Sequence, residues 1–489
     1  MTAEVKDTLG QMNVPRSIMR NTVVQLAGRA ITGLFWIAVL MILTRYLGVE
    51  RVGEYLLVIA ILSLLNISDF GVSTIAIREL ASGESDAKTL LSNVLLIRIV
   101  LAVVAMALVS VVALLLGYPA DVTIAICVGS VSYLFIAVGT GSLGAAFAAN
   151  LRMEFQVLAN IAQHAVSIGL VGLVVSQGWG LIPLVLAYDA SILANTVAVF
   201  FFSRRWVMPN LRFDLALCRR LLWASLPLGL AGVVSMAAFR VDMLMLSKMK
   251  GAEAVGLYGV AYRFVDLGLG ASFFLAISAY PLLSQYHASG HSLRLQRLLQ
   301  RSVDVTALLA MGLCTSVIVF AEPIISFLAS DEFLPAAKTL RILSFALVLI
   351  WVNNMLNHAL MAIGRQVIVL WVDLAGLTVN VGLNLVLIPR FGLNGAAVST
   401  VVTEFTLFLA VLFMVTKNLG YLPSFGAAAK LAPVALAAGA AALLLTPEMI
   451  PLQAAVLASV FGAGIVITRV VTIDDLRLLL RDAPAGATS

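Results

Sequence analysis

The feature that most constrains this chain is a series of fourteen apolar stretches, each close to 20 residues long or longer. A helix of that length crosses the hydrocarbon core of a bilayer, which is roughly 30 Å thick. The connections between the stretches are too short to fold as separate domains. The chain is therefore predicted to be an all-α polytopic membrane protein with about 14 transmembrane helices, or twelve if the two Ala-rich stretches near the end do not span. The approximate limits are 22–44, 54–77, 90–116, 122–149, 153–176, 181–203, 222–247, 255–283, 303–328, 336–362, 366–388, 393–416, 428–446 and 451–470.

Composition excludes the other broad classes of protein. Of 489 residues, 61% are hydrophobic and 11% are charged, whereas roughly 25% of an ordinary soluble protein is charged. This is more apolar surface than one water-soluble core can bury. A disordered chain is also excluded, because disorder requires low hydrophobicity and high charge. The three cysteines are far apart and outside any CxxC pattern, so neither a disulfide framework nor a zinc site is predicted. His287 and His291 have no third ligand nearby in the sequence, and no metal site is predicted there either.

The distribution of basic residues orients the helices. With an even number of spans, 20 of the 31 basic residues lie on the side of the two termini, 7 lie on the opposite side and four lie inside spans. By the positive-inside rule, both termini are predicted to be cytoplasmic. The net charge of +6 comes from short loops that look like orientation anchors, so no nucleic-acid partner is expected. Residues before the first span contain no apolar core, and no cleaved signal peptide is expected there.

A short motif occurs twice. Residues 48–55 read GVERVGEY and residues 251–258 read GAEAVGLY, with five identities at a constant offset of 203. Each copy lies between the first and second span of a six-span block. Because six is even, the two blocks share one orientation, as in parallel transporter repeats. The predicted parts are a cytoplasmic N-terminal segment (1–21), an N-lobe (22–203), a basic linker (204–221), a C-lobe (222–416), two additional helices (428–470) and a cytoplasmic tail (471–489).

Several pieces of sequence, in this order and spacing, resemble the polysaccharide transporter family. This family contains the bacterial oligosaccharide (O-antigen type) flippases of the multidrug/oligosaccharidyl-lipid/polysaccharide exporter superfamily. The resemblance runs from about residue 20 to 416 and is weak in the last two spans. The pieces are TRYLGVERVGEY (44–55), DFGVST (69–74) with IREL (77–80), RVDMLML (240–246) with VGLY (255–258), YPLL (280–283), and LNLVLIP (383–389) with GLNGAA (392–397).

The resemblance implies a fold and an activity. It implies two lobes around a central cavity in the bacterial inner (cytoplasmic) membrane. It also implies transfer of undecaprenyl-pyrophosphate-linked sugars from the cytoplasmic to the periplasmic leaflet by alternating access, for lipopolysaccharide or other surface polysaccharide. The expected partners are that lipid-linked glycan, the bilayer, a polysaccharide polymerase and chain-length proteins. No cofactor is expected beyond H⁺ or Na⁺ as a coupling ion, and no enzymatic activity is expected.

Arginines inside spans are candidates for binding the pyrophosphate or an acidic sugar. A charge at the bilayer centre costs on the order of 3 kcal/mol, so it marks a functional position by default, and guanidinium groups bind phosphate bidentately. Arg29 belongs to a polar stripe with Gln25, Thr32 and Trp36 on one helix face. Arg240 and Arg263 are expected at a similar depth. The alternative is that each arginine pairs with an acid, as Asp266 permits for Arg263 at spacing i,i+3. Arg98 has no such stripe and is expected only to pair with an acid.

Acids inside spans are candidates for ion coupling, because buried carboxylates can exchange protons or bind sodium. The chosen candidates are Asp69, Asp242, Asp266, Asp373 and Glu404; Asp189 is a sixth acid inside a span. Asp373 shares a stripe with Asn380 and Asn384, which are candidates for sugar contact. Interhelical hydrogen bonds are the alternative role for each of these side chains.

Two other functions remain as alternatives at this stage. A cation-coupled drug or small-molecule exporter of the same superfamily would have the same repeat. A membrane enzyme, such as a sugar polymerase, is disfavoured because the largest loop on the periplasmic side, around residues 330–335, leaves little room for an acceptor site. The sequence contains no GxxxxGK[ST] motif, so transport driven by ATP would require another subunit.

Overall fold

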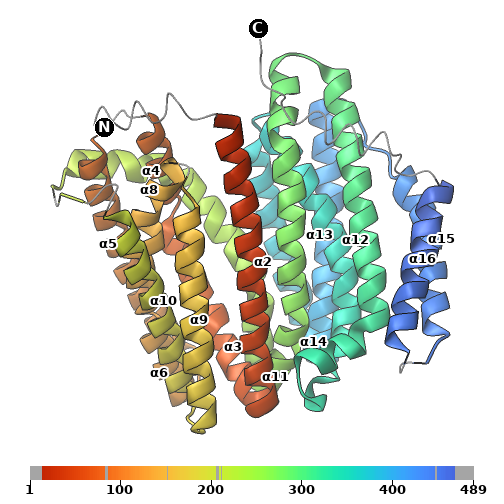
Figure 1. Cartoon of the computed structure of the whole chain (residues 1–489), viewed down its shortest axis with the longest axis horizontal. Coiled ribbons are helices and arrows are strands. Elements are labelled where there is room, and N and C mark those ends of the chain that lie inside the picture. The colour runs from red at the N-terminus through yellow and green to blue at the C-terminus, as the bar shows by residue number, and fades with distance from the viewer. Residues whose placement is uncertain are drawn as a thin grey trace. The chain divides into compact units, whose positions relative to one another are not determined.

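The structure is a computed structural model that describes residues 14–82, 86–150, 152–204, 209–210, 212–446 and 449–468. Within these ranges the chain is helical and contains no β-strand (Figure 1). It divides into two compact units, residues 1–244 (unit 1) and 245–489 (unit 2). The predicted segments 1–21 and 471–489 lie largely or wholly outside the described residues.

Unit 1 is built from helices that are interrupted more often than the apolar pattern predicts. The predicted span 54–77 is not one helix, because the chain turns at Phe70 (φ 44°) and Gly71 (φ 74°). The predicted span 122–149 contains a π-helical segment. In order, the elements are α2 (Val14–Tyr46), α3 (Gly48–Leu64), η1 (Leu65–Asp69), α4 (Val72–Ser82), α5 (Ala87–Leu115), α6 (Ala120–Gly129), α7 (Ser132–Ile136), η2 (Ala137–Leu143), α8 (Gly144–Ala149), α9 (Glu154–Ser176), α10 (Leu181–Ser203) and the first part of α11 (Leu215–Ala288).

Unit 2 has longer continuous helices. It contains the rest of α11, α12 (Ser292–Leu328), η3 (Asp331–Phe333), α13 (Ala336–Ala362), α14 (Gln366–Leu419), α15 (Gly426–Leu443) and α16 (Ile450–Thr468). Both α11 and α14 are two helices joined at a glycine with positive φ, Gly251 (85°) and Gly392 (57°). These are the positions where the sequence predicts a loop between two spans.

The helices agree with the predicted spans. Eleven helices in the described residues are long and apolar enough to cross a membrane. Two of the eleven, in α11 and α14, each consist of two helices joined at a glycine. The predicted span 54–77 corresponds to α3 and α4, which the turn at Phe70 separates. The Ala-rich α15 and α16 are both among the candidates and pack on α12 through Val319, Ala438, Ala442 and Leu457.

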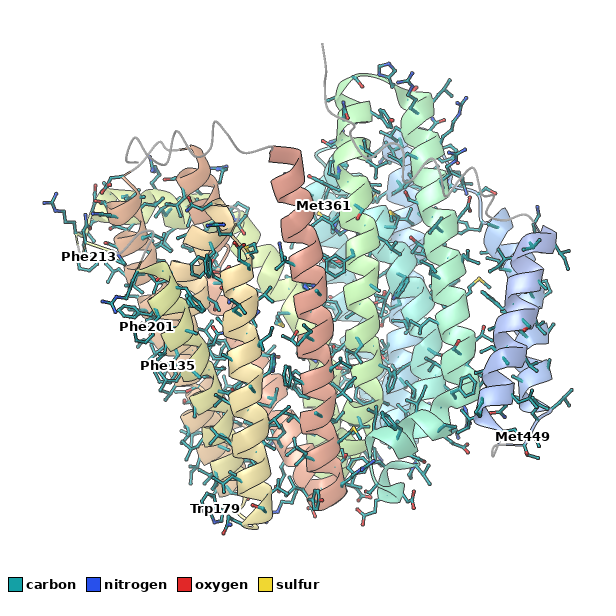
Figure 2. All side chains as sticks on the ribbon, in the orientation of Figure 1. Phe135, Trp179, Phe201, Phe213, Met361 and Met449 are labelled. Atoms are coloured by element: carbon teal, nitrogen blue, oxygen red, sulfur yellow. The ribbon has the colours of Figure 1, made fainter. Side chains whose placement is uncertain are left out.

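The surface of the helices is apolar. Phe201 is 56% exposed, Leu115 is 81% exposed and Leu436 is 75% exposed, and Figure 2 shows Phe201 and Trp179 among the side chains of unit 1. A water-soluble protein rarely exposes large continuous apolar areas. Lipid chains, by contrast, are a favourable environment for such side chains.

The two copies of the repeat have the same local structure. Gly48 (φ 73°) and Gly251 (φ 85°) both take the left-handed conformation that favours glycine. After these glycines, both copies bury the same two side chains. The valines, Val52 and Val255, are fully buried, and the tyrosines, Tyr55 and Tyr258, are 3% and 0% exposed. The repeat found in the sequence is therefore also a structural repeat.

The division between the units falls within α11, between Leu244 and Met245. Residues 222–244, which the sequence repeat assigns to the C-lobe, thus cluster with unit 1. The first part of α11 makes contacts with other elements of unit 1. Arg220, just before this stretch, forms an ion pair with Glu79 (2.8 Å). Gly229 lies against the Phe70 ring, which leaves no space for a Cβ.

Candidate functional site

A polar group that joins three elements of unit 1 is centred on Arg98 of α5. Its guanidinium donates to the Asp69 carboxylate at the end of η1 and contacts the Ser73 hydroxyl on α4. The Ser73 hydroxyl also lies 2.6 Å from Asp69 Oδ1 and 3.1 Å from the carbonyl oxygen of Gly141. Arg98 is only 5% exposed, so the ion pair neutralises a buried charge. The expectation that Arg98 pairs with an acid is met, and its partner is one of the predicted coupling residues.

The π-helical segment η2 makes room for this guanidinium. A Cβ added at Gly141 would overlap the guanidinium of Arg98. A π-helical turn widens the helix by one residue and often occurs at functional positions. Here it brings the backbone of η2 against the side chain of α5, and only glycine fits at the contact.

Arg240 and Asp242 lie on the part of α11 that belongs to unit 1. Arg240 is half-buried, and its Nε donates to the Ser63 hydroxyl of α3 over 3.1 Å. Asp242 is 3% exposed, and its Oδ1 accepts the backbone N–H of Met243 at 2.8 Å. The two side chains thus have separate partners, as the spacing of two residues predicts.

Arg29 is the remaining predicted arginine of unit 1. It lies on α2 and is exposed. Thr32, one turn further along, donates to the carbonyl oxygen of Arg29 at 3.1 Å. The position of Arg29 at the surface of the helix meets one requirement of a binding role, which is that a ligand can reach the side chain.

Arg263 in unit 2 forms the ion pair that its spacing predicts. Its Nη1 lies 2.9 Å from Asp266 Oδ2, and the two side chains are 17% and 24% exposed. Arg263 was predicted to contact pyrophosphate and Asp266 to couple transport to an ion. In this structure the two side chains are paired with each other, so either role requires that the pair separate.

Asn380 and Asn384 are on α14, and their buried side chains form a hydrogen bond with each other. The Asn384 amide donates to Asn380 Oδ1 at 2.8 Å, and the Asn380 amide donates to Thr403 at 3.4 Å. Asn380 is 6% exposed and Asn384 is 0% exposed. In this conformation a sugar cannot reach either side chain, whereas a small ion needs far less space. Asn384 Oδ1 is buried without a hydrogen-bond partner in the described residues.

Glu404 and Asp373, the remaining predicted acids, lie on the two halves of α14. Glu404 Oε2 accepts a hydrogen bond from the Asn353 amide of α13 at 2.9 Å, and the same amide reaches the Glu404 carbonyl oxygen at 3.0 Å. Asp373 is half-buried. Glu404 is thus held by a neutral donor, unlike Asp69 and Asp266, which are held by arginines.

Asp189 of α10 is a residue to which the sequence analysis assigned no role. It is 7% exposed, and its Oδ1 has no hydrogen-bond partner in the described part of the chain. A buried carboxylate with an unsatisfied oxygen is costly if it is charged. The only signal in the sequence was its position in the middle of an apolar span. In the part of the chain that the structure describes, no three His, Cys, Asp or Glu residues cluster as metal ligands.

Comparison with known proteins places this arrangement in a family. Residues 18–287 match the family described as "Polysaccharide biosynthesis protein", and residues 227–386 match the family described as "MatE". The probable low-salt glycan biosynthesis flippase Agl15 of Haloferax volcanii is 24% identical over 160 residues, which are 33% of this chain and 34% of that protein. The curated relatives are matched over only 34% to 45% of their lengths.

Solved structures share the fold over most of the chain. The lipid II flippase MurJ in an inward closed conformation superposes with a TM-score of 0.75 at 18% identity, covering 92% of this chain and 99% of that one. An inward-facing multidrug resistance MATE family transporter gives a TM-score of 0.67 at 17% identity, over 82% of this chain and 98% of the other.

The matched family covers more than half of the chain, and the all-helical, duplicated fold agrees with it. The protein is therefore a multi-pass membrane protein that belongs to the polysaccharide biosynthesis protein family, within the exporter superfamily that includes flippases and MATE transporters.

Proposed function

We propose that this protein is a flippase that moves undecaprenyl-pyrophosphate-linked oligosaccharide from the cytoplasmic to the periplasmic leaflet of the bacterial inner membrane, for assembly of O-antigen, capsule or exopolysaccharide. The observation that carries the proposal is the match of residues 18–287 to the polysaccharide biosynthesis family. The name of Agl15, a flippase of glycan biosynthesis, supports the same class of cargo. The excess of basic residues on the side of the termini supports their cytoplasmic location.

In this proposal, arginines replace the water that a diphosphate loses when it leaves the membrane surface. Arg240 is the strongest candidate, because the hydrogen bond from its Nε to Ser63 fixes the guanidinium within the membrane-spanning part of α11. Arg29, exposed on α2, would receive the anion at another depth. Arg263 would contribute after exchanging Asp266 for the phosphate.

Coupling to H⁺ or Na⁺ would use a carboxylate whose charge can change without removing the counter-charge of a buried arginine. If Asp69 or Asp266 took up a proton, a guanidinium would lose its counter-charge, which is expensive when that guanidinium is buried. Glu404 is held by the neutral amide of Asn353, so its charge can change without that cost. Glu404 is therefore preferred over Asp69 and Asp266 in this proposal, and Asp242 and Asp373 are the other candidates.

The test is the lipid extract of a strain that lacks the protein, in a condition where the surrounding pathway is expressed. We expect undecaprenyl-pyrophosphate oligosaccharide to accumulate with its glycan accessible from the cytoplasmic face only, and surface polysaccharide to be lost. Wild-type protein and Arg390→Ala, which changes an exposed arginine of α14 next to the joint at Gly392, should restore export, whereas Arg240→Ala should not. Absence of accumulation would refute the proposal.

The match of residues 227–386 to MatE favours one alternative, a cation-coupled exporter of drugs or other small molecules. This alternative predicts no accumulation of lipid-linked glycan in the deletion strain. It also predicts efflux of a small organic cation, driven by an imposed ion gradient, from liposomes that contain the purified protein.

A further inference from the structure

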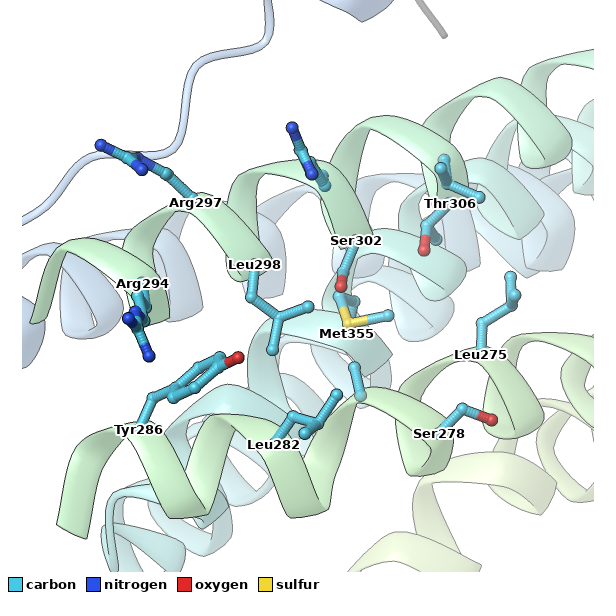
Figure 3. Close-up of a pocket in the computed structure, with 13 residues that line it drawn as sticks. Leu275, Ser278, Leu282, Tyr286, Arg294, Arg297, Leu298, Ser302, Thr306 and Met355 are labelled. Carbon is cyan, nitrogen blue, oxygen red and sulfur yellow. The ribbon is translucent and has the colours of Figure 1, made fainter. Parts of the chain in front are cut away.

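Unit 2 contains a pocket that includes none of the residues discussed above. It lies between the C-terminal part of α11 and the N-terminal part of α12, with Met355 of α13 at its base, and its volume is about 520 Å³. Figure 3 shows the two helices with Arg294 of α12 pointing toward Tyr286 of α11. The lining residues are Leu275, Ser278, Ala279, Leu282, Tyr286, Arg294, Arg297, Leu298, Arg301, Ser302, Val305, Thr306 and Met355.

One end of the pocket carries a row of positive charge. Arg294, Arg297 and Arg301 recur at spacings of three and four, which places them along one face of α12, and no acid lines the pocket. Arg294 and Arg297 are exposed, and in the described part of the chain neither guanidinium has an acidic partner. Other exposed arginines, such as Arg341 with Glu322 at 2.9 Å, are paired.

The other end contains a buried hydroxyl without a partner. Thr306 is 1% exposed and lines the pocket, and its Oγ1 makes no hydrogen bond within the described residues. A threonine in a helix usually satisfies its hydroxyl by donating to the carbonyl oxygen four residues earlier. Thr315, on the same helix, does so with Met311 at 2.8 Å. The hydroxyl of Thr306 is therefore an unsatisfied polar group beside the inner wall of the pocket.

The pocket spans the boundary between water and hydrocarbon. Helix α12 begins at Ser292, so about 17 Å of helix at 1.5 Å per residue precede the predicted span and extend beyond the hydrocarbon core. Arg294 precedes the predicted span that begins near residue 303, whereas Thr306 lies inside it. The distance between them along the axis is about 18 Å. Leucines, a valine and a methionine line the inner part.

We propose that this pocket binds the phosphate-bearing headgroup of a membrane lipid. The phosphate lies against Arg294 and Arg297, with Arg301 completing the row, and the first carbons of the chain pack against Leu282 and Met355. A soluble phosphate compound would leave the apolar wall in water, and an uncharged lipid would not use the arginines. Basic pockets between transmembrane helices are known to bind anionic headgroups.

This ligand chemistry has two sources, a bilayer phospholipid or a polyprenyl phosphate, and a binding experiment separates them. Delipidated protein in neutral detergent is titrated, with native mass spectrometry, against phosphatidylglycerol, undecaprenyl phosphate, phosphatidylcholine and inorganic pyrophosphate. We expect one of the two anionic lipids to bind far more tightly than the other probes, and the preferred one identifies the source. Equal binding of phosphatidylcholine, or displacement of the lipid by pyrophosphate alone, would refute the proposal.

Variants locate the binding to the pocket. Removing one arginine near a membrane surface costs about 1 kcal/mol, or about fivefold in affinity, so Arg294→Gln should weaken binding about fivefold and the double variant with Arg297→Gln about 25-fold. Arg365→Gln changes an exposed arginine in the turn before α14, outside the pocket, and should bind as wild type. If Arg365→Gln weakens binding as much as Arg294→Gln, the attraction is nonspecific and the proposal fails.

Discussion

Gly141→Ala is expected to break the polar group that Arg98 forms with Asp69 and Ser73. The added Cβ would occupy the position of the Arg98 guanidinium, which must then leave Asp69 and Ser73. Arg98 is 5% exposed and comes from α5, between packed helices, so it has little room in which to find another partner. A substitution that is normally favourable in a helix should here be strongly unfavourable.

The magnitude follows from two opposing terms. Separating the partners of a buried ion pair costs about 3–5 kcal/mol. The Asp69 side chain is 35% exposed and can be partly hydrated, which favours the lower end of that range. Replacing glycine by alanine inside a helix returns up to about 1 kcal/mol. The net loss of unfolding free energy should therefore be about 2–4 kcal/mol.

The assay is reversible unfolding in detergent, followed by circular dichroism as the fraction of denaturing detergent is raised. Gly172→Ala on α9 is the matched control, because nothing lies within 4 Å of its added Cβ, and it should be neutral or stabilising. In the background Arg98→Met with Asp69→Asn, no guanidinium remains to collide. Gly141→Ala should then cost less than about 1 kcal/mol. An equal cost in both backgrounds would refute the link between Gly141 and the ion pair.

Three further predictions concern transport, stability and topology. Asp373→Asn should flatten the dependence of transport in liposomes on the imposed ion gradient; an unchanged dependence would remove Asp373 from coupling. Asp86 accepts hydrogen bonds from the Thr89 backbone N–H and hydroxyl at the start of α5, chiefly the hydroxyl, and this lowers the pKa of Asp86 below its usual value. Because the folded-state pKa is the lower one, the contribution of this cap to stability is complete above about pH 4 and is lost as the pH falls through the folded-state pKa. Asp86→Ala should cost about 1 kcal/mol at neutral pH, and its difference from wild type in unfolding free energy should disappear in acid. A cysteine at Ala120, in a background without native cysteines, should react with an impermeant thiol reagent from the periplasmic side, and labelling only from the cytoplasm would overturn the predicted topology.

Much of the fold follows from the sequence because helix length in a bilayer is fixed by membrane thickness. The apolar stretches locate the spans, and Gly251 and Gly392 mark turns that an uninterrupted hydropathy pattern would hide. The breaks inside unit 1 were not predicted. Polar residues and glycine do occur there, as Asp69 and Gly71 beside Phe70 and Gly139 and Gly141 within η2, but a span prediction based on the length of apolar stretches passes over such short interruptions.

The candidate site was predictable only where the partners are close in sequence. Arg263 and Asp266 are three residues apart on one helix, and they pair as expected. Arg98 and Asp69 lie 29 residues apart on different elements, so an acidic partner could be expected but not identified. The burial of Asn384 depends on which face of α14 meets its neighbours, and one sequence without relatives does not reveal this.

The two copies of the repeated motif are followed by helices that differ in continuity. In the first copy the helix that begins at Gly48 ends at Leu64, and the chain turns at Gly71. At the same offset of 203, the second copy has Phe274 in place of Gly71, and its helix continues to Ala288. Backbone amides near Gly71 should therefore exchange with deuterium faster than those near Phe274. The first copy therefore has a point of flexure in the middle of its span, whereas the matching stretch of α11, from Gly251 to Ala288, has none.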